Sequence, residues 1–298
     1  MANVRQFTSR TVDALADRVT HVLGDAGKGV RTAAIPEEVL EQRDESSAQL
    51  LGGVNVEEGF SGGGLEMRNF SYTGVPLLDS FYFQYTDTDH HLSQILILPD
   101  AQPDKMQLGF HDKNRDDDYF FKVVHRMIID QRVEHFSRSL DLCTGSCMRS
   151  IAKPAGDFVF VLVGFQLAFT GGRDHHINVI EVRENDGRLT TRFADKNFDD
   201  NFVWSLKYAY LPRGLFSAIG ESGGVRERGG ARRSIPSGPS VIRGFRFDFK
   251  PYFTSGGDHH IRDVGVMTHD DGRLEVFYED KNGDDGFDWA VRWGVLSP

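Results

Sequence analysis

Histidines and acidic residues recur in a fixed pattern along this chain of 298 residues. A triplet Asp-His-His occurs three times, and an acidic element Asp-Lys-Asn-x-Asp-Asp follows each copy. The triplets begin at Asp89, Asp174 and Asp258, and the acidic elements begin at Asp112, Asp195 and Asp280. Imidazole nitrogens and carboxylate oxygens are metal ligands and strong hydrogen-bonding groups. Such a set of residues could hold a cation or form a hydrogen-bond network.

The spacing of the motifs indicates an internal repeat. The triplets are 85 and 84 residues apart, and self-similarity at a fixed period is typical of one supersecondary unit used several times. Within a repeat, Phe165, Leu167 and Phe169 alternate with small or polar residues, which is the period of a half-buried strand. Asp-Gly pairs at Asp186 and Asp271 separate two apolar runs and predict hairpin turns. In the first repeat we expect the turn within 100–105.

These patterns predict an all-β protein of three tandem antiparallel β-sandwich-like repeats, preceded by a short N-terminal helical segment. The expected boundaries are 1–60 for the helical segment and a linker, 65–130, 157–212 and 241–298 for the β repeats, and 131–156 and 213–240 for two further linkers. The second of these linkers is rich in Gly and Arg, which is typical of a flexible segment. The first contains Cys143 and Cys147, which we expect to be free thiols because the chain has no secretory signal.

The turn positions place each triplet beside its acidic element at the open end of one hairpin. The candidate binding or metal-ligating residues are therefore Asp89, His90, His91, Asp112, Asn114, Asp116 and Asp117 in the first repeat, Asp174, His175, His176, Asp195, Asn197, Asp199 and Asp200 in the second, and Asp258, His259, His260, Asp280, Asn282, Asp284 and Asp285 in the third.

Three interpretations of this set remain open. Closely spaced carboxylate and amide oxygens resemble the ligands of Ca²⁺ loops, although the Glu that closes an EF-hand loop is absent from the sequence. Two His and a carboxylate suit a transition metal, but adjacent His residues in a strand point to opposite faces. A hydrogen-bond network between His and Asp is the third interpretation, because Asp and Asn favour turns. Carboxylates crowded without a counter-charge repel one another, so Ca²⁺ is the cofactor to consider first.

Other side chains give less support for chemistry. Trp204, Trp289 and Trp293 could stack on sugars, but they share the parity of neighbouring Phe, Leu and Val residues, which favours the core. The chain has no nucleophile elbow, P-loop, zinc-protease motif or complete dinucleotide fingerprint. We therefore expect no enzymatic activity.

The apolar pattern of each repeat resembles that of H-type lectin domains. In the second repeat the resemblance lies in the runs V-L-V-G-F-Q-L-A-F, I-N-V-I-E-V, G-R-L-T-T-R-F and F-V-W-S-L-K-Y-A-Y, and it covers about 50 residues of each repeat. The resemblance implies a small antiparallel sandwich that binds sugars and assembles as a trimer, which a chain of three units could imitate. The triplet and the acidic element are not hallmarks of that family, so no sugar-contacting residue is carried over.

Composition limits the remaining classes. The net charge of −10 disfavours a duplex DNA binder, and no apolar run is long enough to span a membrane as a helix. The first residues lack the apolar core of a classical signal peptide, so we expect cytoplasmic synthesis, followed by release or incorporation into an extracellular particle. We predict a non-enzymatic, multivalent, self-associating binding protein for glycans or another repetitive surface. The alternative is a structural subunit of a viral, phage-tail-like or filamentous assembly.

Overall fold

The all-β prediction is confirmed for the part of the chain that the structure describes. The computed structural model describes residues 51–298, except 71–73, 87–90, 103–104, 114–116, 131, 172–173, 250–258 and 282–284. Within these ranges the regular elements are β-strands and one 3₁₀ turn, η2 (Arg213–Leu215). The helices expected in 1–50 lie outside the described residues.

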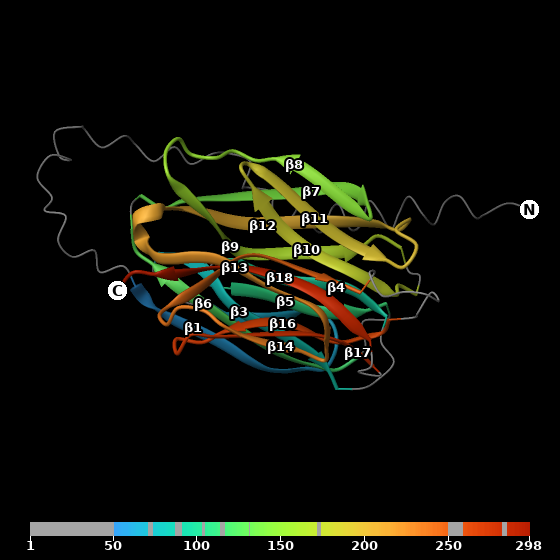
Figure 1. Ribbon diagram of the computed structural model, residues 1–298. Helices are drawn as coiled ribbons and strands as arrows, with labels where there is room; N and C mark the ends of the chain where they lie inside the picture. Colours follow the sequence, from blue (N-terminus) through green and yellow to red (C-terminus); the bar gives the residue numbers. More distant parts are fainter. Residues whose placement is uncertain are drawn as a thin grey trace, which may run out of the picture. The chain divides into compact units, whose positions relative to one another are not determined.

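The strands follow one another in three runs of six, which we call the first, second and third units (Figure 1). The first unit comprises β1 (Leu51–Ser61), β2 (Glu66–Asn69), β3 (Val75–Tyr85), β4 (Leu92–Gln102), β5 (Lys105–Asp112) and β6 (Tyr119–Ile128). The second comprises β7 (Glu134–Thr144), β8 (Ser146–Ser150), β9 (Phe158–Phe169), β10 (Ile177–Asn185), β11 (Arg188–Asp195) and β12 (Asn201–Pro212). The third comprises β13 (Phe216–Arg228), β14 (Ala231–Ser234), β15 (Ser240–Asp248), β16 (Ile261–Thr268), β17 (Arg273–Asp280) and β18 (Gly286–Leu296).

All three units have the same antiparallel pairing scheme. The sixth strand of a unit lies between its first and third strands, as β12 does between β7 and β9. The fifth strand lies between the fourth and second, as β11 does between β10 and β8. Aromatic rings join the two halves of each unit, for example Phe169 of β9 and Phe193 of β11, whose centroids are 4.3 Å apart. Each unit is therefore sandwich-like.

Strand pairing joins each unit to the next and the third unit back to the first, and we call this closed arrangement of three units the ring. The fourth strand of each unit pairs with the third strand of the next: β4 with β9, β10 with β15, and β16 with β3. The last of these pairings connects the third unit to the first, and Figure 1 shows the orange-red β16 and the teal β3 in one sheet. Closure removes the edge that an open row of units would leave.

Three equivalent phenylalanines pack together where the third strands meet. Phe81, Phe165 and Phe245 lie on β3, β9 and β15, and their ring centroids are 5.1–5.4 Å apart. All three are buried, as the alternation at Phe165 predicted. The ring thus has an approximate threefold axis with an aromatic core.

The predicted hairpins and core positions are confirmed. In β10–β11 the strands turn after Asn185, which faces Arg188, and Gly187 adopts a positive φ of 77° that favours glycine. The β16–β17 hairpin turns at Gly272 with a φ of 86°, and β4–β5 turns between Gln102 and Lys105. The three tryptophans are buried, at 1% exposure for Trp204, 4% for Trp289 and 9% for Trp293.

The expected linkers were wrong. Strand β1 lies in the segment before residue 65, β7 and β8 lie within 131–156, and β13 and β14 lie within 213–240. Apolar residues do not follow the inward face of these strands: in β13 Ile219 and Val225 are exposed, whereas the half-buried positions are the small or polar Ala218, Gly220, Ser222 and Gly224. Such a strand lacks the inward apolar alternation from which strands are predicted.

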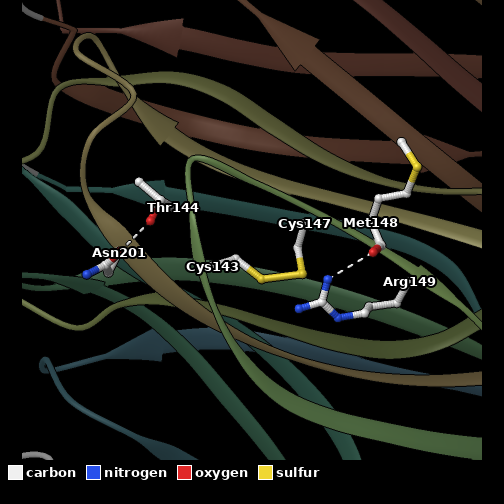
Figure 2. Close-up of a disulfide and its surroundings, with 6 residues drawn as sticks. All are labelled: Cys143, Thr144, Cys147, Met148, Arg149 and Asn201. Carbon is white, nitrogen blue, oxygen red and sulfur yellow. Dashed lines mark hydrogen bonds between the residues drawn. A yellow bond between two sulfur atoms is a disulfide. The ribbon is translucent and has the colours of Figure 1, made fainter.

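The expectation of free thiols was also wrong, because Cys143 and Cys147 form a disulfide (Figure 2). Cys143 lies near the end of β7 and Cys147 near the start of β8, with Gly145 at a φ of 62° in the turn between the strands. The turn brings the two Cα atoms to 5.5 Å, within the range that a disulfide spans. Beside it, the Thr144 hydroxyl donates to Asn201 Oδ1 at 2.6 Å, as Figure 2 shows.

Candidate functional site

The described candidate residues gather at the open ends of the hairpins, as predicted. The register pairs Leu92 with Asp112, Ile177 with Asp195 and Ile261 with Asp280, so each triplet ends beside its acidic element. The candidates that lie outside the described residues are Asp89, His90, Asn114, Asp116, Asp258, Asn282 and Asp284.

In the second and third units the first histidine of the triplet turns into its own unit. His175 lies 2.8 Å from Asp200 (Nδ1 to Oδ2), and its ring stacks on Phe169 at 3.8 Å between centroids. In the third unit, His259 lies 3.0 Å from Asp285 and stacks on Phe249 at 4.2 Å. Both histidines are 1% exposed. This geometry fits the hydrogen-bond interpretation, because each His–Asp pair ties a triplet to the end of its acidic element.

The acidic element of the second unit forms a tight turn. Asp195 Oδ1 accepts the backbone N–H groups of Asn197 and Phe198 at 3.1 and 2.9 Å. Burial raises the pKa of Asp195, and the nearby charge of Asp200 raises it further. Oxygens of Asp195, Asp199 and Asp200 approach within 4.8 Å of one another, although Asp195 and Asp200 already have the partners described above. Calcium binding here stays a prediction.

The remaining described candidates of the acidic elements include two buried carboxylates at strand ends. Asp112 and Asp280 are buried at the ends of β5 and β17, at 4% and 1% exposure. Asp117 lies two residues before the start of β6. Burial raises the pKa of the buried Tyr85, and the charges of Asp112 and Asp117 raise it further. Asp280 groups with His259 and Asp285, with one ligand atom from each within 4.8 Å of the others.

The second histidines of the triplets meet one another across the ring. His91, His176 and His260 each place a ring nitrogen within 4.8 Å of the other two. Their ring centroids are 5.1 Å apart for His91 and His176, 4.3 Å for His91 and His260, and 5.1 Å for His176 and His260. We call this group the histidine triad.

The histidine triad differs from the transition-metal site that the sequence suggested. That site would have used the two adjacent histidines of one triplet, which point to opposite faces of a strand. In the second unit the two do diverge, since His175 faces Asp200 and His176 faces His91 and His260. One histidine from each unit comes together instead. The signal that could have found this group was the recurrence itself, combined with closure of three units around one axis.

An ion pair connects two units beside the triad. Lys113 of the first acidic element forms a salt bridge and hydrogen bond with Asp174 of the second triplet. The Lys113 contact holds the pKa of Asp174 below its usual range, and the charges of His91 and His176 contribute in the same direction. Asp174 belongs to the triplet that ends in His176, so this contact links the first and second units next to that triplet.

A second candidate site lies on the outer face of the sheet that joins the first and third units. Phe60, Phe120, Tyr82 and Phe277 come from β1, β6, β3 and β17, and we call them the aromatic strip. The ring centroids are 5.3 Å apart for Phe60 and Phe120, 6.0 Å for Tyr82 and Phe120, and 4.8 Å for Tyr82 and Phe277. Phe60 is 68% exposed and the others are half-buried.

Polar groups flank the aromatic strip. Asp263 of β16 accepts the Tyr82 hydroxyl at 3.2 Å and the Gln84 amide at 3.4 Å. Burial raises the pKa of Asp263 to about 7, with Glu279 adding to the rise. Arg262 forms an ion pair with Glu279 and lies 3.8 Å from Asp263. This site was not predicted, because only tryptophans were considered as sugar-stacking residues and Phe60 fell in a segment expected to be a linker.

No family model and no curated protein matches this chain. Among solved structures, a chain of the atomic structure of Sulfolobus Turreted Icosahedral Virus aligns over 82% of this chain and 91% of its own length, with 6% identity and a TM-score of 0.18. That likeness is too weak to carry an argument about function. No helix among the described residues is long and apolar enough to cross a membrane.

Proposed function

We propose that the protein is a non-enzymatic binding protein that recognises glycans on the aromatic strip. The observation that carries the proposal is the row of Phe60, Phe120, Tyr82 and Phe277 on a solvent-facing surface. Aromatic faces pack against the apolar C–H faces of sugars, and flanking polar groups fix the orientation of a bound ligand. Gln84, Arg262 and Glu279 supply donors and acceptors for sugar hydroxyls beside the rings.

The strip lies at one of the three joints of the ring, a joint being the place where the fourth strand of one unit pairs with the third strand of the next. The positions equivalent to Tyr82 in the other units hold Gln166 and Arg246, since these residues face the matching strands in the same register. Within the described ranges one chain therefore offers one such strip, and multivalency would come from self-association. Linked weak sites gain avidity of roughly 10²–10⁴ when several can engage at once.

The test is a glycan array followed by calorimetric titration of the sugar that binds. Phe60→Ala is the main variant, because Phe60 is 68% exposed and its loss should leave the fold intact. We expect affinity to fall about tenfold, equivalent to ~1.4 kcal/mol of lost stacking. Val225→Ala is the matched control, since Val225 is 71% exposed on β13 and outside the strip. No glycan hit, or equal affinity of wild type and both Phe60→Ala and Phe120→Ala, would overturn the proposal.

A structural subunit is the second candidate, and the edge strand β1 favours it. Val54 and Val56 are 52% and 51% exposed on the same face as Phe60. Exposed apolar residues on an edge strand suit contact with another chain. Negative-stain microscopy distinguishes the two candidates: large particles that a Val54→Lys/Val56→Lys variant no longer forms would support a subunit, whereas glycan binding by small species would support recognition.

A further inference from the structure

We propose that the histidine triad binds one transition-metal ion, for which Zn²⁺ is the probe. His91, His176 and His260 are the third residues of their triplets, and each directly precedes the fourth strand of its unit. The site uses one ligand from each unit. It is separate from the aromatic strip, and the proposal does not depend on glycan binding.

The distances suit a shared ion. Zn–N bonds of ~2.0–2.1 Å at tetrahedral angles place the ligating nitrogens about 3.3–3.4 Å apart. The three ring nitrogens already lie within 4.8 Å of one another, and the ring centroids are 4.3–5.1 Å apart. Small rotations about the side-chain bonds would therefore bring the nitrogens to bonding distance without a movement of the strands.

The surroundings also suit a cation. Three protonated imidazoles this close would repel, whereas neutral imidazoles around a metal ion attract it. His260 is 9% exposed, and Nδ1 of His91 is buried without a hydrogen-bond partner among the described residues.

The ligand set selects the class of metal. Imidazole nitrogens suit Zn²⁺, Cu²⁺, Ni²⁺ and iron, whereas Ca²⁺ requires six or more oxygen ligands. In the described part of the chain the group contains three side-chain ligands, so water would complete a tetrahedral site. Because each unit supplies one ligand, a bound ion would hold the three units together on the axis of the ring.

The test measures metal content and metal-dependent stability of the full chain. Protein stripped with EDTA and dialysed would be titrated with Zn²⁺, with bound metal counted by mass spectrometry and Co²⁺ used as a spectroscopic probe. We expect one ion per chain, tetrahedral Co²⁺ absorption bands and a Tm that rises with Zn²⁺ concentration, because a native-state ligand stabilises by mass action.

His176→Asn should abolish the Co²⁺ bands and the Zn²⁺-dependent rise in Tm. His269→Asn is the matched control, because His269 is paired with Glu275 outside the triad. If His176→Asn does not fold, His91→Gln serves, and the Co²⁺ spectrum of wild type remains an independent measurement. Absence of stoichiometric Zn²⁺ binding would overturn the proposal, and so would binding that both triad variants retain.

Discussion

At the scale of single residues, burial sets the pKa of the carboxyl group of Asp263 beside the aromatic strip. Asp263 is 4% exposed and has a pKa of about 7, because burial disfavours its charge and Glu279 lies nearby. In the unfolded chain an Asp has a pKa of about 3.9. Between these two values the folded protein holds a proton that the unfolded chain has released. The free energy of unfolding therefore falls as pH rises from about 4 to about 7.

Asp263→Asn should remove this part of the pH dependence. We expect the variant to be more stable than wild type above pH 7, by roughly 2–4 kcal/mol, and to lose that advantage near pH 4. Urea denaturation at a series of pH values measures the difference. Asp271→Asn is the control, because that side chain is 64% exposed in a turn. Parallel curves for wild type and Asp263→Asn would contradict the prediction.

The acidic element of the second unit supports another residue-scale prediction. Asp195 accepts two backbone N–H groups, so Asp195→Ala leaves both without that partner. We expect faster hydrogen exchange at Asn197 and Phe198 and a loss of about 1–2 kcal/mol in stability. Unchanged exchange at these two amides would show that the turn does not need the carboxylate.

Calcium binding by the same element can be tested apart from the histidine triad. In a His176→Asn background, chelator should lower the Tm and added Ca²⁺ should restore it if the acidic elements hold calcium. If neither treatment changes the Tm, the calcium prediction fails and the hydrogen-bond network accounts for these residues.

At the scale of elements, a buried ion pair fastens β16 to the first unit. Arg126 Nε of β6 lies 2.5 Å from Asp79 Oδ2 of β3, and the Thr268 hydroxyl at the end of β16 donates to Asp79 Oδ1 at 2.6 Å. Asp79 is 2% exposed and Arg126 is 7% exposed. Removing Asp79 leaves the buried Arg126 guanidinium with the exposed Asp270 as its remaining acidic partner, and breaking a buried pair in this way is more costly than replacing both of its members.

Asp79→Ala should therefore destabilise the protein by about 3–5 kcal/mol. The double variant Asp79→Leu/Arg126→Met should recover a large part of that loss, because no buried charge remains. Denaturant unfolding of Asp79→Leu, Arg126→Met and the double variant gives the coupling energy. A double variant as unstable as the sum of the singles would show that the two residues act independently.

The elements also show which parts of the fold the sequence can predict. The alternation at Phe165, Leu167 and Phe169 and the Asp-Gly turns predicted hairpins that the structure contains, because periodicity and turn chemistry are local. The strand β13 was missed, since its half-buried positions hold Ala, Gly and Ser while Ile219 and Val225 face solvent, so no inward apolar alternation marks it. The histidine triad was missed for a different reason. Its members are brought together by pairing between units, which no local pattern encodes.

At the scale of the whole molecule, the ring makes three joints depend on one another. Each joint pairs a fourth strand with a third strand, and at each of them a glycine permits the close approach; at the β10–β15 joint a Cβ at Gly244 would lie 2.8 Å from the Val182 carbonyl oxygen. A Cβ at Gly265 of β16 would lie 2.6 Å from the Phe81 carbonyl oxygen, and a Cβ at Gly164 of β9 would lie 2.3 Å from the Ile97 carbonyl oxygen. A larger residue at any of these positions must push two units apart.

Gly265→Ala and Gly164→Ala should each destabilise the protein by about 1–3 kcal/mol through overpacking. Gly214→Ala is the matched control, because nothing lies within 4 Å of a Cβ at that position. Since opening one joint removes closure from the whole cycle, we expect either joint variant to unfold in one transition with hydrogen-exchange protection reduced in all three units. If Gly265→Ala reduced protection only in the first and third units, the units would be separately stable and the closed ring would not unfold cooperatively.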